Sequence, residues 1–206
     1  MKNRIALLSI FFIAFLLLYV GIVGNSALIN SFDQSLAVFA ESIRNNFYDG
    51  IFIFATNIGY VFGSILIFLV LAFVLIKKRE KISSVILISS SFLGMVLAAT
   101  GKYSAERIRP SGYLINETGF SFPSYHATMA TIFLLSSLLL VAPLIQNKFL
   151  KISFIIIAII LFPLIAFSRI YLSVHYASDV LGGIFIGIIS YLLAKVFAEK
   201  ISLHNA

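Results

Sequence analysis

The residues best suited to chemistry lie between Ser168 and Asp179, a short stretch flanked by two long apolar runs. The chain is 61% hydrophobic and 11% charged, so ionisable groups beside its apolar runs are costly and indicate a functional site. His175 and Asp179 are four residues apart, and on a helix this spacing places two side chains on one face within hydrogen-bonding reach. A carboxylate against one imidazole nitrogen fixes the tautomer and leaves the other nitrogen free to attack. With Arg169 close by, the stretch predicts an activated histidine acting on an anion, and phosphate fits an arginine best.

Composition indicates an integral membrane protein with a single domain over residues 1–206. The mean hydropathy is +1.07, and a soluble domain has about 25% charged residues. The chain has no cysteine, which excludes disulfides and thiolate metal sites. His126, His175 and His204 are far apart without metal-ligand spacing, so we expect no metal and no cofactor, and we expect His204 in the polar tail to be inert. No basic run with interleaved aromatics indicates nucleic acid as a partner, and nothing indicates an obligate protein partner.

The apolar runs predict an all-α fold with six transmembrane helices, since a span needs about 20 mostly apolar residues. The first run follows Lys2 and Arg4, as in a signal peptide, but its apolar core exceeds the usual range of about 7–15 residues. We therefore expect a retained helix there. The six predicted spans are Ile5–Val23, Ile51–Ile76, Ile82–Thr100, Ser124–Ile145, Ile152–Tyr171 and Ala177–Phe197.

A short helix is expected between the first and second spans. Ser31 and Gln34 resemble a capping box, with Ser31 as the N-cap. Apolar residues follow at helical spacing, which indicates an amphipathic helix on the outer interface; an ordinary surface helix packed on the bundle fits the pattern equally well. The stripe consists of Leu36, Phe39, Ile43 and Phe47.

Lysine and arginine in the short loops predict the orientation in the membrane. With six spans, the basic residues before the first span, after the second and fourth, and after the sixth fall on one side, which the positive-inside rule makes cytoplasmic. Both termini are then cytoplasmic. The other side violates the rule, and an anion-binding site would explain its cations, which include Lys102, Arg107, Arg109 and Arg169.

Three polar stretches converge on this outer face. The third span ends at Lys102–Pro110, the fourth begins at Pro123–His126, and the fifth and sixth are joined through Ser168–Asp179. Because alternate loops of a bundle share a side, one site can draw on all three stretches. The sequence thus predicts an extracytoplasmic active site.

Together these stretches resemble the type 2 phosphatidic acid phosphatase (PAP2) family of membrane lipid phosphatases. That family has a lysine, six residues and Arg-Pro; then Pro-Ser-Gly-His; then Ser-Arg, five residues, His, three residues and Asp. The corresponding segments here are Lys102–Pro110, Pro123–His126 and Ser168–Asp179. One position departs from the pattern, because Tyr125 replaces the usual glycine. We expect its side chain to point away from His126 toward the membrane interface, with the hydroxyl in water.

The resemblance implies a metal-independent mechanism. His175 would be the nucleophile that forms a phosphohistidine, and Asp179 would orient it. His126 would protonate the leaving group and then activate water, as a general acid and base. Preorganised cations and donors at the start of the fourth span would neutralise the transferred phosphoryl group; this phosphate-binding set is Lys102, Arg109, Ser124 and Arg169. Glu106 and Arg107 lie off the fixed positions and are interpreted as structural, with Glu106 paired to Lys102 at i,i+4.

The resemblance implies hydrolysis of a lipid phosphate or diphosphate at the outer leaflet, with membrane lipids as surroundings. Undecaprenyl diphosphate and phosphatidylglycerol phosphate are the leading substrates. A flippase or transporter for an anionic lipid could use the same cations, although transporters usually have internal repeats and polar groups at the bilayer midplane. Phosphoryl transfer to another lipid also remains open. The soluble vanadium haloperoxidases have a similar site, but six spans argue against that class.

Overall fold

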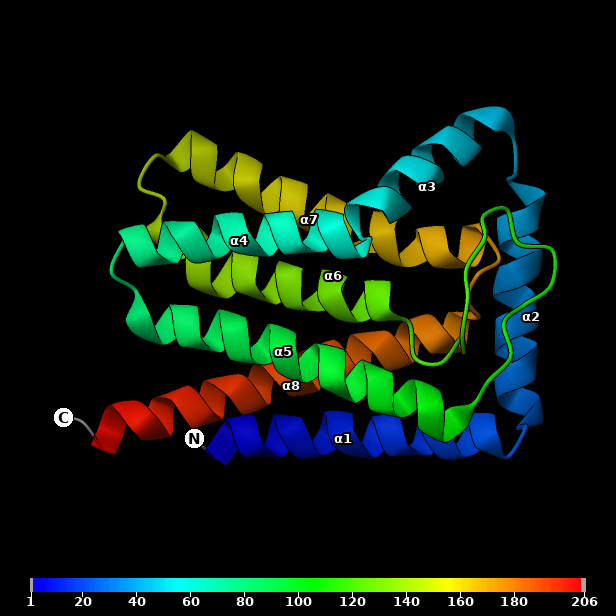
Figure 1. The fold of residues 1–206 in the computed structure, drawn as a ribbon, viewed down its shortest axis with the longest axis horizontal. Helices are drawn as coiled ribbons and strands as arrows, with labels where there is room; N and C mark the ends of the chain where they lie inside the picture. Colours follow the sequence, from blue (N-terminus) through cyan, green and yellow to red (C-terminus); the bar gives the residue numbers. More distant parts are fainter. Residues whose placement is uncertain (1, 205–206) are drawn as a thin grey trace.

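The computed structural model describes residues 2–204, apart from the side chains of residues 2, 61, 62 and 201–204, among which is His204. The described chain is all α-helical, as predicted, and long helices run side by side along the bundle (Figure 1). The helices are α1 (Lys2–Val23), α2 (Ala27–Ser42), α3 (Asn46–Ile58), α4 (Val61–Lys77), α5 (Lys81–Ala105), α6 (Tyr125–Ser136), α7 (Lys148–Tyr171) and α8 (Ala177–His204).

The predicted membrane spans are recovered. Five helical segments are long and apolar enough to cross a membrane, and α3 with α4 forms a sixth span if this bent pair is counted as one. The fourth span continues beyond α6 through a π-helical turn at Ser137–Val141 and a 3₁₀ turn at Ala142–Leu144. It is the central span, with 67% of its apolar window buried.

The second span is not the single helix that its continuous hydropathy predicted. The chain breaks between α3 and α4, and the two helices differ in direction by 54°. Gly59 ends α3, and a Cβ at this residue would lie 2.9 Å from Cδ2 of His126 and 2.6 Å from Cγ2 of Ile165. The bend therefore brings bare backbone close to one of the predicted catalytic histidines.

The expected short helix exists, but its predicted start is wrong. Helix α2 begins at Ala27, with Ser26 as its N-cap, so Ser31 lies inside the helix. Asparagine provides the clear cap in this region: the Asn45 side chain accepts hydrogen bonds from the backbone of the first turn of α3. Helix α2 lies across the end of the bundle (Figure 1) and packs against α7 and α8. This matches a surface helix packed on the bundle.

Small residues bring α8 close to α6. A Cβ on Gly183 would lie 2.4 Å from the carbonyl oxygen of Ser124, and a Cβ on Gly187 would lie 2.6 Å from Cβ of Thr131. Glycine in a G-x-x-x-G pattern allows such close approach of two backbones. The tight contact fixes the start of α8, which carries Asp179, against the start of α6, which carries His126.

Helix α1 is part of the same bundle. It packs along α8 and also contacts α5. The Phe15 ring stacks on Phe122 with 5.9 Å between centroids, and the Tyr19 hydroxyl donates to the Ser104 carbonyl at 3.0 Å. These contacts fit a retained helix.

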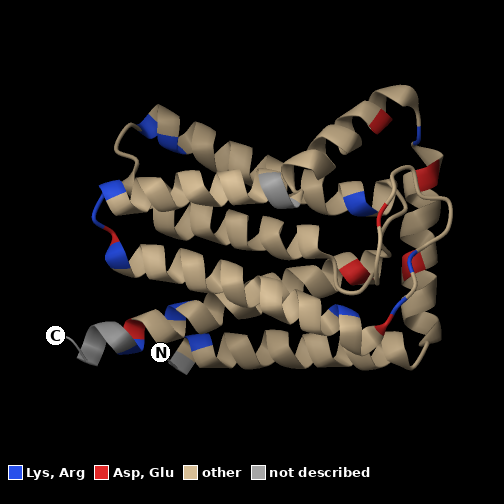
Figure 2. Cartoon of the chain, viewed as in Figure 1, with Lys and Arg blue, Asp and Glu red and all other residues tan. Residues whose placement is uncertain are grey.

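The two ends of the bundle differ in charge. Both termini and the α4–α5 and α6–α7 turns lie at one end (Figure 1), where basic residues predominate (Figure 2). The opposite end holds α2, the long loop between α5 and α6, and the α7–α8 turn, and there basic and acidic residues are mixed (Figure 2). The three polar stretches converge at this second end.

Candidate active site

The α7–α8 turn positions His175. Helix α7 ends at Tyr171 and α8 begins at Ala177, so His175 lies in the turn and not on the helix that its spacing suggested. Its backbone N–H donates to the Arg169 carbonyl at 3.1 Å. Ser173 adopts a left-handed conformation with φ of 53°, which is uncommon for a residue with a side chain. Nη2 of Arg44 holds this turn by donating to the hydroxyl of Ser173 at 2.6 Å.

The hydrogen-bonding environment defines the His175 tautomer. Nη1 of Arg109 lies 3.2 Å from Nε2 of His175. Because an arginine can only donate, Nε2 must be the acceptor and the proton resides on Nδ1. Nδ1 faces Oδ2 of Asp179 at 3.4 Å, within ion-pair range but longer than a well-formed hydrogen bond. The nitrogen that carries a lone pair therefore faces the cations, as a nucleophile on phosphate requires.

The His175 imidazole is kept neutral. Its side chain is buried, and burial together with the positive charges of Arg169, Lys102 and Arg109 holds the pKa of His175 well below its usual range. Desolvation disfavours the charged imidazolium, and nearby cations disfavour it further. The lone pair on Nε2 is then present at neutral pH.

Asp179 is a fully buried carboxylate in the first turn of α8. Its Oδ2 accepts from the Tyr176 backbone N–H at 2.9 Å, while Oδ1 accepts from Nη1 of Arg107 at 2.6 Å. Its backbone carbonyl accepts from the N–H of Ser124 at 3.0 Å. These contacts fix the carboxylate plane and connect the third motif to the second.

The three predicted phosphate-binding cations are gathered around carbonyl and carboxylate oxygens. Nζ of Lys102 donates to the carbonyl of Phe120 at 2.7 Å. The Arg109 guanidinium donates to three carbonyls, including that of Val174 at 2.7 Å. Arg169 has no exposed surface. All three are thus held before any phosphate binds, which is the preorganisation expected for electrostatic stabilisation.

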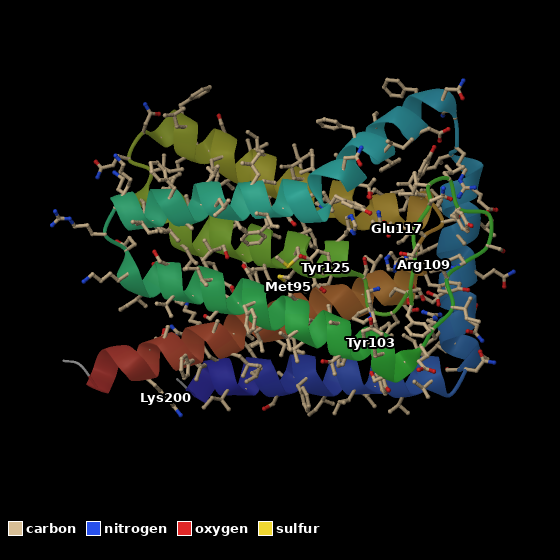
Figure 3. All side chains as sticks on the ribbon, viewed as in Figure 1. Met95, Tyr103, Arg109, Glu117, Tyr125 and Lys200 are labelled. Carbon is tan, nitrogen blue, oxygen red and sulfur yellow. The ribbon has the colours of Figure 1, made fainter. Side chains whose placement is uncertain are left out.

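Glu117, in the loop between α5 and α6, completes this cluster and was missed from the sequence. Its Oε1 accepts from Nη2 of Arg169 at 2.5 Å, and its Oε2 lies 3.9 Å from Nη2 of Arg109. Figure 3 shows Arg109 and Glu117 together at this end of the bundle. The carboxylate therefore lies against two of the three predicted phosphate-binding cations. The sequence contains one signal for such a residue: the predicted site holds three cations and only one carboxylate, Asp179.

We expect Glu117→Gln to strengthen anion binding about three- to tenfold, up to roughly 1.4 kcal/mol, with kcat maintained. The neutral amide competes less well with phosphate for Arg169 and Arg109. The inhibition constant of inorganic phosphate measures the effect, with Glu106→Gln as the matched control because Glu106 is exposed in the same loop. Unchanged or weaker phosphate binding would mean that Glu117 orients the arginines instead of competing for them.

His126 lies in the first turn of α6 and packs against the α3–α4 bend. Its ring lies close to the backbone of Thr56, whose hydroxyl accepts a hydrogen bond from Arg169. Nε2 of His126 is buried and has no hydrogen-bond partner among the described residues. Ser124 is the buried N-cap of α6, with its hydroxyl 3.5 Å from the N–H of Ala127. Thr56 was not anticipated from the sequence, yet it connects His126 to Arg169.

Tyr125 does not take the expected orientation. Its ring lies edge-on to the ring of His126, with 6.4 Å between centroids, and its side chain hydrogen-bonds Ser64 of α4. Figure 3 shows Tyr125 at the start of α6, within the bundle. The half-buried side chain therefore joins α4 to α6, and the prediction of a wet hydroxyl at the interface is wrong.

Glu106 and Arg107, which were both interpreted as structural, lie in different surroundings. Glu106 is exposed, and its expected partner Lys102 bonds to Phe120 instead. Arg107 bridges Asp33 of α2, at 2.7 Å, and Asp179, at 2.6 Å.

A cavity of about 540 Å³ opens beside this bridge, between α2 and the α7–α8 turn. Its lining includes Asn30, Asp33, Gln34, Arg107, His175 and Tyr176.

The predicted site residues thus form one connected cluster that draws on all three motifs. Such a cluster holds cations, two histidines and a paired carboxylate, the kinds of group that can bind a phosphoryl group, attack it and transfer a proton. Among the described residues there is no group of three or more histidine, cysteine or acidic side chains placed to hold a metal ion.

Comparisons with known proteins identify the family and the fold. A sequence model of the PAP2 superfamily matches residues 82–202. The chain is 29% identical over 192 residues to phosphatidylglycerophosphatase B of Bacillus subtilis (strain 168), covering 92% of this chain and 94% of the relative. The crystal structure of the transmembrane PAP2-type phosphatidylglycerolphosphate phosphatase from Bacillus subtilis superposes with a TM-score of 0.81 at 27% identity, covering 98% of each chain. Aquifex aeolicus LpxE shares the fold, with a TM-score of 0.57 at 22% identity over 81% of this chain and 94% of that one. The chain belongs to the PAP2 superfamily and is an enzyme of the PAP2 phosphatase type.

Proposed function

We propose that the protein hydrolyses a lipid phosphate or diphosphate without a metal ion, through a phosphohistidine on His175. The observation that carries this proposal is the buried imidazole of His175, whose Nε2 lies 3.2 Å from Nη1 of Arg109 while its Nδ1 faces Asp179. A nucleophile within a cage of cations fits phosphoryl transfer, in which negative charge spreads over the equatorial oxygens.

The first step is attack of Nε2 on phosphorus. The N–P bond forms as the bond from phosphorus to the leaving oxygen breaks, and that oxygen takes a proton from His126, which enters the step as an imidazolium and leaves it neutral. Lys102, Arg109 and Arg169 neutralise the equatorial oxygens once Glu117 has been displaced. Asp179 holds Nδ1–H and stabilises the positive charge that the imidazole acquires.

The second step returns the enzyme to its starting state. A water molecule gives a proton to His126 as its oxygen attacks phosphorus, the N–P bond breaks, and inorganic phosphate leaves. The cavity between α2 and the α7–α8 turn borders His175, which supports a water-side route to the intermediate.

Phosphatidylglycerol phosphate is our first choice of substrate, because the relatives that resemble the whole chain are named for that activity. Undecaprenyl diphosphate has the same terminal phosphate and remains a second choice. The bundle offers apolar outer surfaces along its spans, which suits a substrate that stays in the bilayer.

A panel of lipid phosphates and diphosphates, with purified protein in detergent, tests the proposal. We expect phosphate release from at least one lipid, at the same rate with and without EDTA, because three fixed cations stabilise the phosphoryl group. Loss of activity in EDTA with recovery in magnesium would contradict the metal-free mechanism. Transfer of phosphate to an added lipid without release would indicate a phosphotransferase, and lipid movement without either reaction would indicate a flippase.

We further propose that the protein spans the cytoplasmic membrane with its termini inside and the site outside. The support is the predominance of lysine and arginine at the end with the termini (Figure 2). A cysteine introduced at Ser111, in the α5–α6 loop, should react with an impermeant thiol reagent in intact cells. A cysteine at Lys148, at the opposite end, is the control and should react only after lysis; the reverse result would invert the topology.

A further inference from the structure

We propose that Arg107, held in place by Asp33 of α2, is a positioning residue for the Asp179–His175 pair. This inference rests on the proposed role of His175 as nucleophile. Arg107 lies two residues before the motif arginine, Arg109. Arg109 contacts His175, whereas Arg107 contacts the carboxylate behind it.

The two carboxylate oxygens of Asp179 face different partners. Oδ1 accepts from Nη1 of Arg107 at 2.6 Å, and Oδ2 faces Nδ1 of His175 at 3.4 Å. A rotation of the carboxylate that carried Oδ2 away from the imidazole would break the bond to Arg107. The arginine thus sets which oxygen His175 meets and at what angle.

Arg107 is itself fixed from three sides. Its Nη2 donates to Oδ2 of Asp33 at 2.7 Å, and its Nη1 also donates to the Ser178 hydroxyl at 2.7 Å. Its guanidinium carbon lies 4.0 Å from the centroid of the Tyr176 ring, a cation–π arrangement. A planar guanidinium bound at both ends has little freedom to turn.

Asp33 connects this arrangement to α2. It is only 5% exposed, so this carboxylate lies inside the protein and not on its surface. Its Oδ1 accepts from the backbone N–H of Ser178 at 2.7 Å, and its Oδ2 accepts from the Ser178 hydroxyl at the same distance. The carboxylate therefore satisfies a donor in the first turn of α8 that has no intrahelical partner.

The charges also require this bridge. Asp179 is fully buried, and a buried carboxylate without an opposite charge is strongly destabilised. His175 cannot provide that charge before the reaction, because its imidazole is neutral. Arg107 supplies the opposite charge within hydrogen-bonding distance of Asp179, and Asp33 balances the second half of the guanidinium. The alternative is that the bridge only attaches α2 to the bundle.

A double-mutant cycle separates the two roles. We expect Arg107→Gln to lower kcat about 10- to 100-fold with KM within about twofold, since on this proposal Arg107 acts through Asp179 and not on the phosphate. In an Asp179→Asn background, the same substitution should lower kcat less than about threefold, because the group through which it acts is already altered. Equal losses in both backgrounds, or an effect on KM alone, would overturn the proposal.

Arg44→Gln is the matched control. Arg44 anchors the same turn through the carbonyl of Tyr171 and the hydroxyl of Ser173, and within the described part of the chain it forms no hydrogen bond or ion pair with Asp33 or Asp179. Its effect on kcat should therefore be the same in both backgrounds. If Arg107→Gln does not fold, Arg107→Lys keeps the charge but not the two-ended geometry, and the same non-additive pattern with Asp179→Asn is expected; additivity would again overturn the proposal.

Asp33→Asn tests the other end of the bridge. The amide keeps the shape and the acceptor for Ser178 but loses the charge, so we expect a loss in kcat of about three- to tenfold that also vanishes in the Asp179→Asn background. His175→Gln in the same assay separates the two hypotheses. If that variant keeps wild-type activity, the proposed function fails; if it is inactive while the cycle is additive, only the role of Arg107 fails.

Discussion

His175→Gln is expected to lower kcat by about 10⁴-fold or more on every lipid phosphate that the enzyme accepts, a magnitude typical of removing a nucleophile. Glutamine fills similar space in the buried turn, but it has no lone pair able to form a bond to phosphorus. Phosphate release from detergent-solubilised protein measures the loss, and thermal unfolding of both proteins checks that the variant is folded.

Asp179→Asn is compared with His175→Gln, because it should lower kcat by a smaller factor. Asparagine can still hydrogen-bond the imidazole, but it favours the wrong tautomer and stabilises the imidazolium less. We expect a loss about 10- to 100-fold smaller than that of His175→Gln. Substantial turnover by folded His175→Gln would exclude this histidine as the nucleophile.

His126→Gln is expected to lower kcat on a lipid phosphate by about 10²–10⁴-fold, the usual contribution of general acid–base catalysis. The leaving alkoxide of a lipid needs a proton, and the attacking water must lose one. A nitrophenyl phosphate separates these tasks, because nitrophenolate leaves without protonation. The variant should then give a burst of nitrophenolate equal to the enzyme concentration, followed by slow turnover.

Tyr125→Phe is the matched control for that variant. Tyr125 neighbours His126 and bonds to Ser64, so losing the hydroxyl should disturb the contact between α4 and α6 while leaving kcat within about threefold. Equal losses by His126→Gln on both substrates, without a burst, would show that His126 does not act as the acid in the first step.

The convergence of the motifs could be predicted from the sequence because it depends on span number. Alternate loops of a helical bundle share a side, and this brought Lys102, His126 and His175 together before any geometry was known. The contact between His175 and Asp179 was also predicted, but the reason was wrong. It arises across a turn that precedes α8 and not along one face of a helix.

The bend between α3 and α4 could not be predicted, because hydropathy is continuous through it. The bend depends on Gly59 meeting His126 and Ile165, and these partners are distant in sequence. The prediction of where α2 starts failed for a different reason. Ser26 and Ser31 are both acceptable N-caps, and local pattern does not choose between them.

Glu117 and Asp33 were not identified from the sequence, and Arg107 was interpreted only as structural, because the partners of all three are distant in sequence. Charge balance gives the physical reason for their positions: the cations that would hold phosphate need a carboxylate in the resting state, and the buried Asp179 needs a cation. The sequence indicates that the cations need a carboxylate partner and that Asp179 needs a cationic one. Only the tertiary packing of α2 and the α5–α6 loop identifies which residues they are.

Trapping the phosphorylated enzyme tests the account most directly. His126→Gln, mixed with ³²P-labelled nitrophenyl phosphate in EDTA and quenched in alkali, should retain close to one label per protein, because breakdown of the intermediate lacks its base. The label should be stable in alkali, labile in acid, and located by mass spectrometry on the peptide that contains His175. Phosphate release without any protein-bound label, or a label on a residue other than His175, would contradict the proposed mechanism.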